Sequence, residues 1–243
     1  MPPAAYILCT SPRSGSTLLC TLLRDSGVAG HPQSWFHRPS LEDWCRGLDL
    51  PSATPLTDIF TAATIKGRGG TNIFGLRLQR HSAPFFIAQL RATHPLATSD
   101  TAAIAAQFGP TKYIHLHRAD KVAQAVSLVR AAQSGLWHRN ADGSDLERTG
   151  QGQTPHYDPQ AIAAERDALT TYDAEWEAWF AEQDIAPMRL TYDALAANPA
   201  EALHKTLAFL DLPIAGEPKP ATAPLADAIN ADWITRFKAD TAT

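Results

Sequence analysis

The residues best suited to chemistry lie in a short polar segment that follows an apolar run near the start of the sequence. The segment at 11–17 reads SPRSGST. Backbone N–H groups at the start of a helix point outward and the helix dipole favours an anion, so a small-residue turn between a strand and a helix can hold a phosphate. Gly15 lets the backbone approach such a ligand closely. Further donors to its oxygens are Arg13, Ser14, Ser16 and Thr17.

Two other interpretations of this segment stay open. A nucleoside triphosphatase loop has the pattern G-x-x-x-x-G-K-[S/T], but here no glycine opens the segment and Ser16 stands where the lysine belongs. The missing lysine disfavours a triphosphatase. Serine and threonine also cap helices routinely, so the hydroxyls could serve only to begin the helix.

A second pair of candidate anion-binding residues follows a later apolar run. Arg118 comes directly after this run, at 111–116, and Ser127 lies about two and a half helical turns beyond it. If the chain turns sharply at 119–120, the two side chains can face one phosphate, with Arg118 supplying the charge and Ser127 a hydrogen bond. Taken separately, an arginine at the end of a strand is usually a solvated surface group.

The elements that must position these residues alternate along the chain. Apolar runs predict strands at 6–10, 73–78, 111–116 and 188–192. Helical periodicity predicts helices directly after the first strand, at 41–45, 83–91, 122–137, 162–183 and 200–210, and around Trp233 and Phe237. This alternation predicts an α/β fold, a P-loop-like three-layer arrangement in which helices flank a central parallel sheet.

The composition favours one compact domain. The chain has 243 residues, 44% of them hydrophobic, which is enough for a single domain spanning 1–243 with a sizeable core. A net charge of −4 offers no overall attraction for nucleic acid, so an anionic ligand must be held by a local cluster of donors. The polar stretch at 138–160 is predicted to be a loop, either a mobile lid or an ordinary surface connection.

The cysteines and the N-terminus indicate a cytoplasmic protein. Cys9, Cys20 and Cys45 are odd in number and lack the close pairing of a zinc site or a disulfide framework, so we expect reduced, mostly buried thiols. The first ten residues carry no basic segment typical of a signal peptide, and no apolar run is long enough to span a bilayer.

Several segments together resemble a known family. They are YILCTSPRSGSTLL at 6–19, GHPQSWF at 30–36, IHLHRADKVAQAVSLVRAAQSGLW at 114–137 and DWITRF at 232–237. In this order they look like the bacterial sulfotransferases of the trehalose 2-sulfotransferase and lipopolysaccharide sulfotransferase type. The resemblance runs through nearly the whole chain.

The resemblance implies a donor and a reaction. The segment from Arg13 to Thr17 would hold the 5′-phosphosulfate of PAPS (3′-phosphoadenosine 5′-phosphosulfate), and Arg118 and Ser127 would hold its 3′-phosphate. The sulfuryl group would pass to a hydroxyl of a carbohydrate, glycolipid or related small molecule, leaving adenosine 3′,5′-bisphosphate. Arg13 would stabilise the leaving phosphate, and no metal is expected. Related enzymes can be dimers, so a homodimer stays open.

The acceptor side departs from the family in one position. In the family a glutamate follows the Pro-Gln dipeptide and acts as the base, but here that residue is Ser34, which is too weakly basic for the role unaided. His31 or His37 can replace it, and we prefer His37 because it follows an aromatic pair that would line an acceptor pocket. The residues expected to contact the acceptor are Gln33, Trp35, Phe36 and Arg77, the last of which stands where the family often has a lysine.

Two alternatives to the sulfotransferase remain. A non-catalytic protein that binds PAPS or adenosine 3′,5′-bisphosphate would need the same anion-binding residues but no base. A P-loop nucleotide kinase is disfavoured by the missing lysine. The replacement of the glutamate by Ser34 also leaves open an acceptor other than trehalose.

Overall fold

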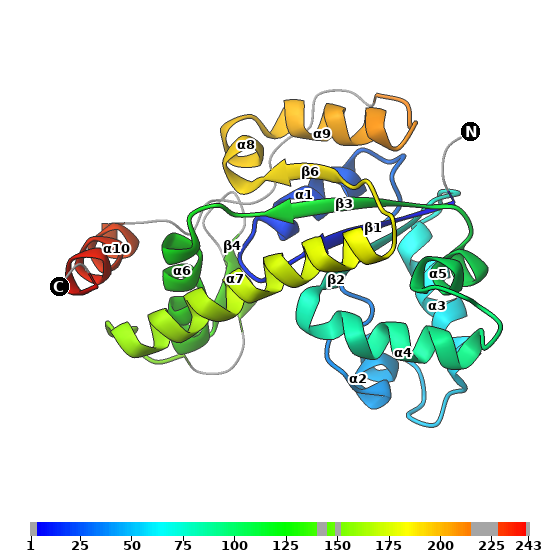
Figure 1. The fold of residues 1–243 in the computed structure, drawn as a ribbon, viewed down its shortest axis with the longest axis horizontal. Coiled ribbons are helices and arrows are strands. Elements are labelled where there is room, and N and C mark those ends of the chain that lie inside the picture. Colours follow the sequence, from blue (N-terminus) through cyan, green and yellow to red (C-terminus); the bar gives the residue numbers. More distant parts are fainter. Residues whose placement is uncertain (1–3, 140–144, 149–151, 215–227, 242–243) are drawn as a thin grey trace.

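The core of the fold is a parallel sheet of four strands. A computed structural model describes residues 4–139, 145–148, 152–214 and 228–241. The strands lie in the order β2-β1-β3-β6 and all pair in parallel (Figure 1). Their bounds are β1 Ala5–Thr10, β2 Phe74–Gln79, β3 Thr111–His117 and β6 Met188–Thr191.

Helices cover both faces of this sheet. They are α1 Ser16–Asp25, α2 Leu41–Gly47, α3 Leu56–Arg68, α4 Ala83–Thr93, α5 Asp100–Phe108, α6 Lys121–Ser134, α7 Pro159–Glu182, α8 Tyr192–Ala197, α9 Pro199–Phe209 and α10 Ala228–Asp240, with a short 3₁₀ turn η1 at Arg80–Ser82. Side chains alternate across a strand. Tyr6 and Leu8 of β1 therefore pack with α1, α8 and α9, whereas Ile7 and Cys9 pack with α3, α4, α5 and α7. The predicted α/β fold, with helices flanking a central parallel sheet, is confirmed.

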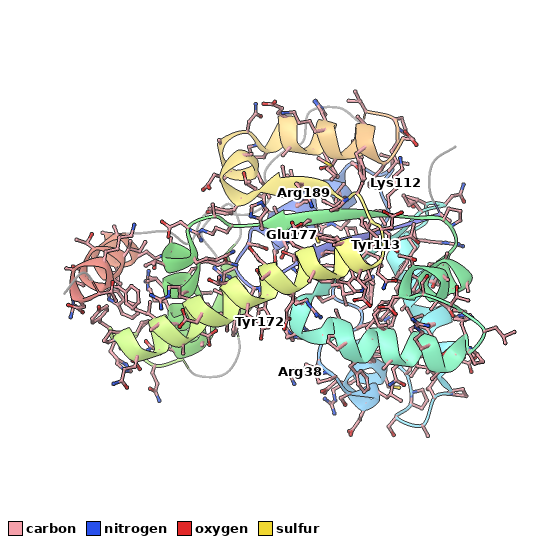
Figure 2. The ribbon with its side chains drawn as sticks, in the orientation of Figure 1. Arg38, Lys112, Tyr113, Tyr172, Glu177 and Arg189 are labelled. Atoms are coloured by element: carbon pink, nitrogen blue, oxygen red, sulfur yellow. The ribbon has the colours of Figure 1, made fainter. Side chains whose placement is uncertain are left out.

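Hydrogen bonds from two neighbouring residues attach the long helix α7 to the sheet. Near the end of β1, the buried indole of Trp176 donates to the carbonyl of Thr10 at 2.9 Å. The next residue, Glu177, accepts from Arg189 of β6 at 2.7 Å (Figure 2). Glu177 also bonds His115 of β3 at 3.0 Å. These contacts fix α7 beside the carboxyl ends of the strands.

Several elements differ from the predictions. Helices α3, α5 and α8 were not predicted from the sequence. A two-stranded antiparallel ribbon, formed by β4 Leu136–Arg139 and β5 Asp145–Arg148, was not predicted either. The stretch at 138–160, predicted to be a loop, therefore contains strand residues. Its remainder lies partly outside the described residues, so the lid stays a prediction. The sequence predicted a helix over 122–137. In the structure α6 ends at Ser134, and β4 begins at Leu136.

The strand order reverses between β1 and β3, the two central strands of the sheet. The chain leaves β1 towards β2 on one side and leaves β3 towards β6 on the other, so the loops after β1 and β3 diverge. Thr10, the last residue of β1, is aligned with Leu116 in β3 and with Gln79 in β2. Ligands of open α/β sheets bind outside the carboxyl ends of the strands at such a point. The two predicted anion-binding segments both begin there.

Two smaller observations complete the fold. All three cysteines are buried and free, as predicted. Within the described ranges, no helix is both long and apolar enough to cross a membrane, and no group of three or more His, Cys, Asp or Glu side chains is arranged to hold a metal ion.

Candidate functional site

The loop after β1 turns sharply into α1 through Gly15. This glycine is the N-cap of α1, has a left-handed φ of 86°, and makes no side-chain capping bond. The cap residue therefore does not satisfy the N–H groups of the first helical turn with a side chain. The helix-cap interpretation of the serines loses its support, because the residue at the cap has no side chain. The geometry instead suits an anion at the start of α1.

A β-carbon at this position would disturb the loop. It would lie 2.8 Å from Cδ2 of Tyr192, and the positive φ disfavours any L side chain. We expect Gly15→Ala to destabilise the protein by about 1–3 kcal/mol and to weaken anion binding. Thermal unfolding and phosphate-ligand titration would measure both effects. Gly47→Ala, at a helical glycine with no atom within 4 Å of the added carbon, is the control and is expected to unfold at or above the wild-type temperature.

The hydroxyl of Ser14 forms a hydrogen bond within the protein. Thr10 Oγ1 donates to the carbonyl of Leu116 in β3 at 2.8 Å, and Ser14 Oγ lies 2.5 Å from Thr10 Oγ1. Ser14 is fully buried and Ser16 is 5% exposed. These two hydroxyls were predicted to contact the ligand, whereas the structure places Ser14 as a brace between the loop and β3. Its contribution to a ligand would come from its backbone.

Arg13 joins the loop to α6 and β4. Its Nε donates to Ser127 Oγ at 3.0 Å, and its Nη1 donates to the carbonyl of Trp137. The backbone of Arg13 has a positive φ of 60°, which is uncommon for a residue with a β-carbon. Two residues predicted from separate segments to bind the two ends of one ligand are therefore in direct contact.

Arg118 lies beside the same loop. Its guanidinium carbon is 4.3 Å from the ring centre of Tyr192, the same ring that borders Gly15. Its Nε is buried and has no hydrogen-bond partner among the described residues. A buried donor without a partner costs free energy unless a ligand or water satisfies it. The guanidinium, stacked on Tyr192 near the start of α1, can therefore still donate a hydrogen bond from its Nε to a ligand.

Arg77 connects the donor loop to the acceptor loop. Its Nε donates to Ser34 Oγ and its Nη1 to Thr17 Oγ1, each at 2.8 Å. Arg77 reaches Ser34 because the backbone at Gln33 pairs with β2. Gln33 forms a parallel bridge with Leu76, and its carbonyl accepts from the N–H of Arg77 at 3.0 Å. Arg77 is therefore part of the site.

Phe36 anchors the loop that carries Ser34 and His37. It is 1% exposed and its ring packs against Trp44, Phe60 and Phe86 at centroid distances of 4.8 to 5.4 Å. We predicted Phe36 at the acceptor surface, but its side chain lies in the core and can act on an acceptor only through the loop it holds.

The other predicted acceptor residues lie on this loop and differ in exposure. Trp35 is half-buried and donates to the carbonyl of Gly75 at 3.3 Å. Gln33 is exposed and its amide bonds His31 at 2.8 Å. That bond occupies one ring nitrogen of His31, whereas the ring of His37 makes no hydrogen bond to any residue that the structure describes.

His37 faces a second histidine. The ring centres of His37 and His81 are 5.4 Å apart, and His81 in turn lies 6.2 Å from Tyr172 of α7. Partial burial, together with His81, Arg77 and Arg38, lowers the pKa of His37 to about 4. Its imidazole is therefore neutral near pH 7 and can accept a proton. Sequence reasoning missed His81, which lies in η1 and had no partner recognisable from spacing.

Comparisons with known proteins identify the family. The family described as Stf0 sulphotransferase matches residues 5–240. The chain belongs to the Stf0 sulfotransferase family. It is 30% identical to the trehalose 2-sulfotransferase of Mycolicibacterium smegmatis over 98% of this chain and 96% of that protein. It is also 30% identical to the trehalose 2-sulfotransferase of Mycobacterium tuberculosis, over 97% of this chain and 94% of that protein.

A solved structure of a sulfotransferase from Alicyclobacillus acidocaldarius aligns with a TM-score of 0.49 and 12% identity, covering 99% of this chain and 92% of that one. For this member of the Stf0 family, the activity class is that of a sulfotransferase, as the sequence predicted. The site just described lies inside the region that the family matches.

Proposed function

We propose that this Stf0 sulfotransferase transfers the sulfuryl group of PAPS to a hydroxyl of a carbohydrate. The observation that supports this most is the contact between Arg13 and Ser127 at 3.0 Å, together with Arg118, which stacks on the Tyr192 ring that borders Gly15. A donor with phosphate at both ends needs two groups of cationic and hydroxyl donors. The loops that carry the proposed groups both follow the carboxyl ends of the neighbouring strands β1 and β3, which supports one shared site.

Each end of the donor has its own set of groups. The 5′-phosphosulfate would lie against the first turn of α1 and the guanidinium of Arg13. The 3′-phosphate would accept from Arg118, whose buried Nε has no partner among the described residues, and from Ser127. Arginine suits this role because its planar fork matches phosphate oxygens.

The transfer forms one bond and breaks one. The acceptor oxygen attacks sulfur in line, a new S–O bond forms, and the bond between sulfur and the bridging phosphate oxygen breaks. The acceptor proton passes to His37 Nδ1 or Nε2, and the electron pair of the broken bond stays on the phosphate of adenosine 3′,5′-bisphosphate. Arg13 and the α1 amides would stabilise that charge as it builds.

The acceptor is proposed from the relatives, both of which are named for trehalose. Polar and aromatic side chains on the acceptor loop fit a polyhydroxylated ligand: the indole of Trp35 offers a flat face, and Gln33, His37 and Arg38 are exposed beside it. Ser34 in place of the family's glutamate indicates that this pocket is not identical to that of the family. Trehalose is the first acceptor to assay, followed by other disaccharides and glycolipids.

Calorimetry with adenosine 3′,5′-bisphosphate and with ADP tests the donor. We expect the bisphosphate to bind more tightly, because only it offers a 3′-phosphate to Arg118. Arg118→Met keeps the packing on Tyr192 but loses charged hydrogen bonds worth about 1.5–3 kcal/mol. Its affinity for the bisphosphate should fall about 10- to 100-fold, with little change for ADP.

Arg68→Met is the matched control. Arg68 is exposed on α3 and its side chain makes no bond within the part of the chain that the structure describes. This variant should bind both nucleotides as the wild type does. Tighter binding of ADP than of the bisphosphate by the wild type would exclude the proposed 3′-phosphate site. Tight bisphosphate binding without sulfuryl transfer to any acceptor would favour the non-catalytic alternative.

A further inference from the structure

A fully buried glutamine lies beneath the donor loop. Gln124 of α6 is 0% exposed. Its Nε2 donates to Ser11 Oγ at 3.1 Å and to the carbonyl of Pro12 at 2.6 Å, and its Oε1 accepts from Lys121 Nζ at 3.1 Å. Both of its amide protons and its oxygen are therefore used.

The same bonds continue into the loop after β3. Lys121 Nζ also donates to the carbonyl of Arg118 at 2.6 Å and to Asp173 Oδ2 of α7. The other oxygen of Asp173 accepts from Ser11 Oγ at 3.3 Å. Gln124, Lys121, Asp173 and Ser11 thus form a closed ring of hydrogen bonds, which we call the Gln124 ring.

The Gln124 ring touches both anion-binding segments through their backbones. It holds the carbonyl of Pro12, directly before Arg13, and the carbonyl of Arg118. Arg13 has a strained φ of 60°, a conformation that persists only where surrounding contacts enforce it. The ring fixes the peptide that precedes this residue.

We propose that Gln124 is a positioning residue that couples the two halves of the donor site. Gln124 bonds the carbonyl of Pro12 directly and reaches the carbonyl of Arg118 through Lys121. This arrangement keeps the two peptides at a fixed separation, so that a nucleotide with phosphate at both ends meets both sets of donors at once. The nature of this ligand rests on the proposed function. The coupling of the two segments does not, because it follows from bonds within the protein.

Gln124→Met tests the proposal with a side chain of similar length and no amide. In amide hydrogen exchange of the free protein, the peptides covering 11–17 and 118–121 should both exchange about tenfold faster or more. The dissociation constant for adenosine 3′,5′-bisphosphate should rise about tenfold or more, and the KM for the donor should rise more than the KM for the acceptor. Gln160→Met, at an exposed position of α7, is the matched control and should leave all these values unchanged.

A double-mutant cycle separates coupling from a purely structural role. In wild type, Arg118→Met lowers affinity for the bisphosphate; in the Gln124→Met background it should lower affinity several-fold less, because the two halves no longer act together. Additive losses would overturn the proposal, as would unchanged exchange at 11–17 and 118–121. If Gln124→Met does not fold, Ser11→Ala, which removes one hydroxyl from the ring, should show the same pattern with smaller effects.

The proposed function and this inference can fail separately. If the wild type does not bind the bisphosphate, the proposed donor is wrong, and hydrogen exchange alone decides the coupling. Faster exchange in both segments would then still support the Gln124 ring as their link. Faster exchange in one segment only would overturn it.

Discussion

Replacing Arg13 with methionine should lower kcat for sulfuryl transfer about 10²- to 10³-fold, the loss typical of removing one donor to a developing anion. Arg13 lies in the loop directly before α1, where the leaving phosphate is proposed to lie. Its contacts with Ser127 and with the carbonyl of Trp137 hold the guanidinium in one orientation. Rapid-quench measurement of a single turnover with saturating donor would isolate this effect from binding.

Three further variants make the Arg13 prediction specific. Arg13→Lys should lose most of the rate, because an ammonium cannot donate to Ser127 and Trp137 while also facing the phosphate. Ser127→Ala keeps the guanidinium and should lower kcat far less than Arg13→Met. Arg68→Met should be unchanged. A full rate in Arg13→Met would remove this residue from the chemical step.

The strands that carry the site could be predicted because their residues are buried on both faces. A continuous apolar run such as YILCT predicts a strand at the centre of a parallel sheet. The polar residues that follow it must then lie at the carboxyl end of that strand. That reasoning placed the loops that carry Arg13 and Arg118 at the carboxyl ends of neighbouring strands, but it did not predict that Ser127 bonds Arg13. The ribbon of β4 and β5 could not be predicted in this way, since its sequence is polar and has no apolar alternation.

The contacts within the site were less predictable. Phe36 resembles an acceptor-facing aromatic in sequence, and only the packing of α2, α3 and α4 around it places it in the core. The Gln124 ring joins residues that are 113 and 52 positions apart in sequence. No local pattern predicts such a contact. A polar residue within an apolar stretch of a helix is one available signal, and Gln124 is flanked by Ala123, Ala125 and Val126, all buried in α6.

If the resemblance holds and Ser34 stands in place of a glutamate base, the proposed transfer needs another base. Its hydroxyl accepts from Arg77, so the residue that replaces the family's glutamate is a neutral hydrogen-bond partner of a cation. His37 lies on the same loop, where the turn between its N–H and the carbonyl of Ser34 brings it back towards that position. The indole of Trp44 fixes the turn by donating to the carbonyl of Arg38 at 2.8 Å.

His37→Ala should therefore lower kcat about 10²- to 10⁴-fold, the range for loss of a general base, while the affinity for adenosine 3′,5′-bisphosphate stays unchanged. His94→Ala is the control: it lies at the far end of α4, about 16 Å along the helix from the carboxyl edge of the sheet. Calorimetry of each variant with the bisphosphate would separate binding from chemistry. Equal rates in both variants would exclude His37 as the base.

The pH dependence gives an independent test of the same residue. A base must be unprotonated, and because the pKa of His37 is lowered to about 4, its neutral form persists well below the pH at which an ordinary histidine becomes charged. With both substrates limiting, the rate should stay level from pH 8 to about 5 and decline only near pH 4. A decline centred at the ordinary histidine pKa of about 6.5 would contradict this environment for His37.

In the His37→Ala background, Ser34→Glu should recover part of the rate, because it returns a carboxylate to the position where Arg77 can orient it.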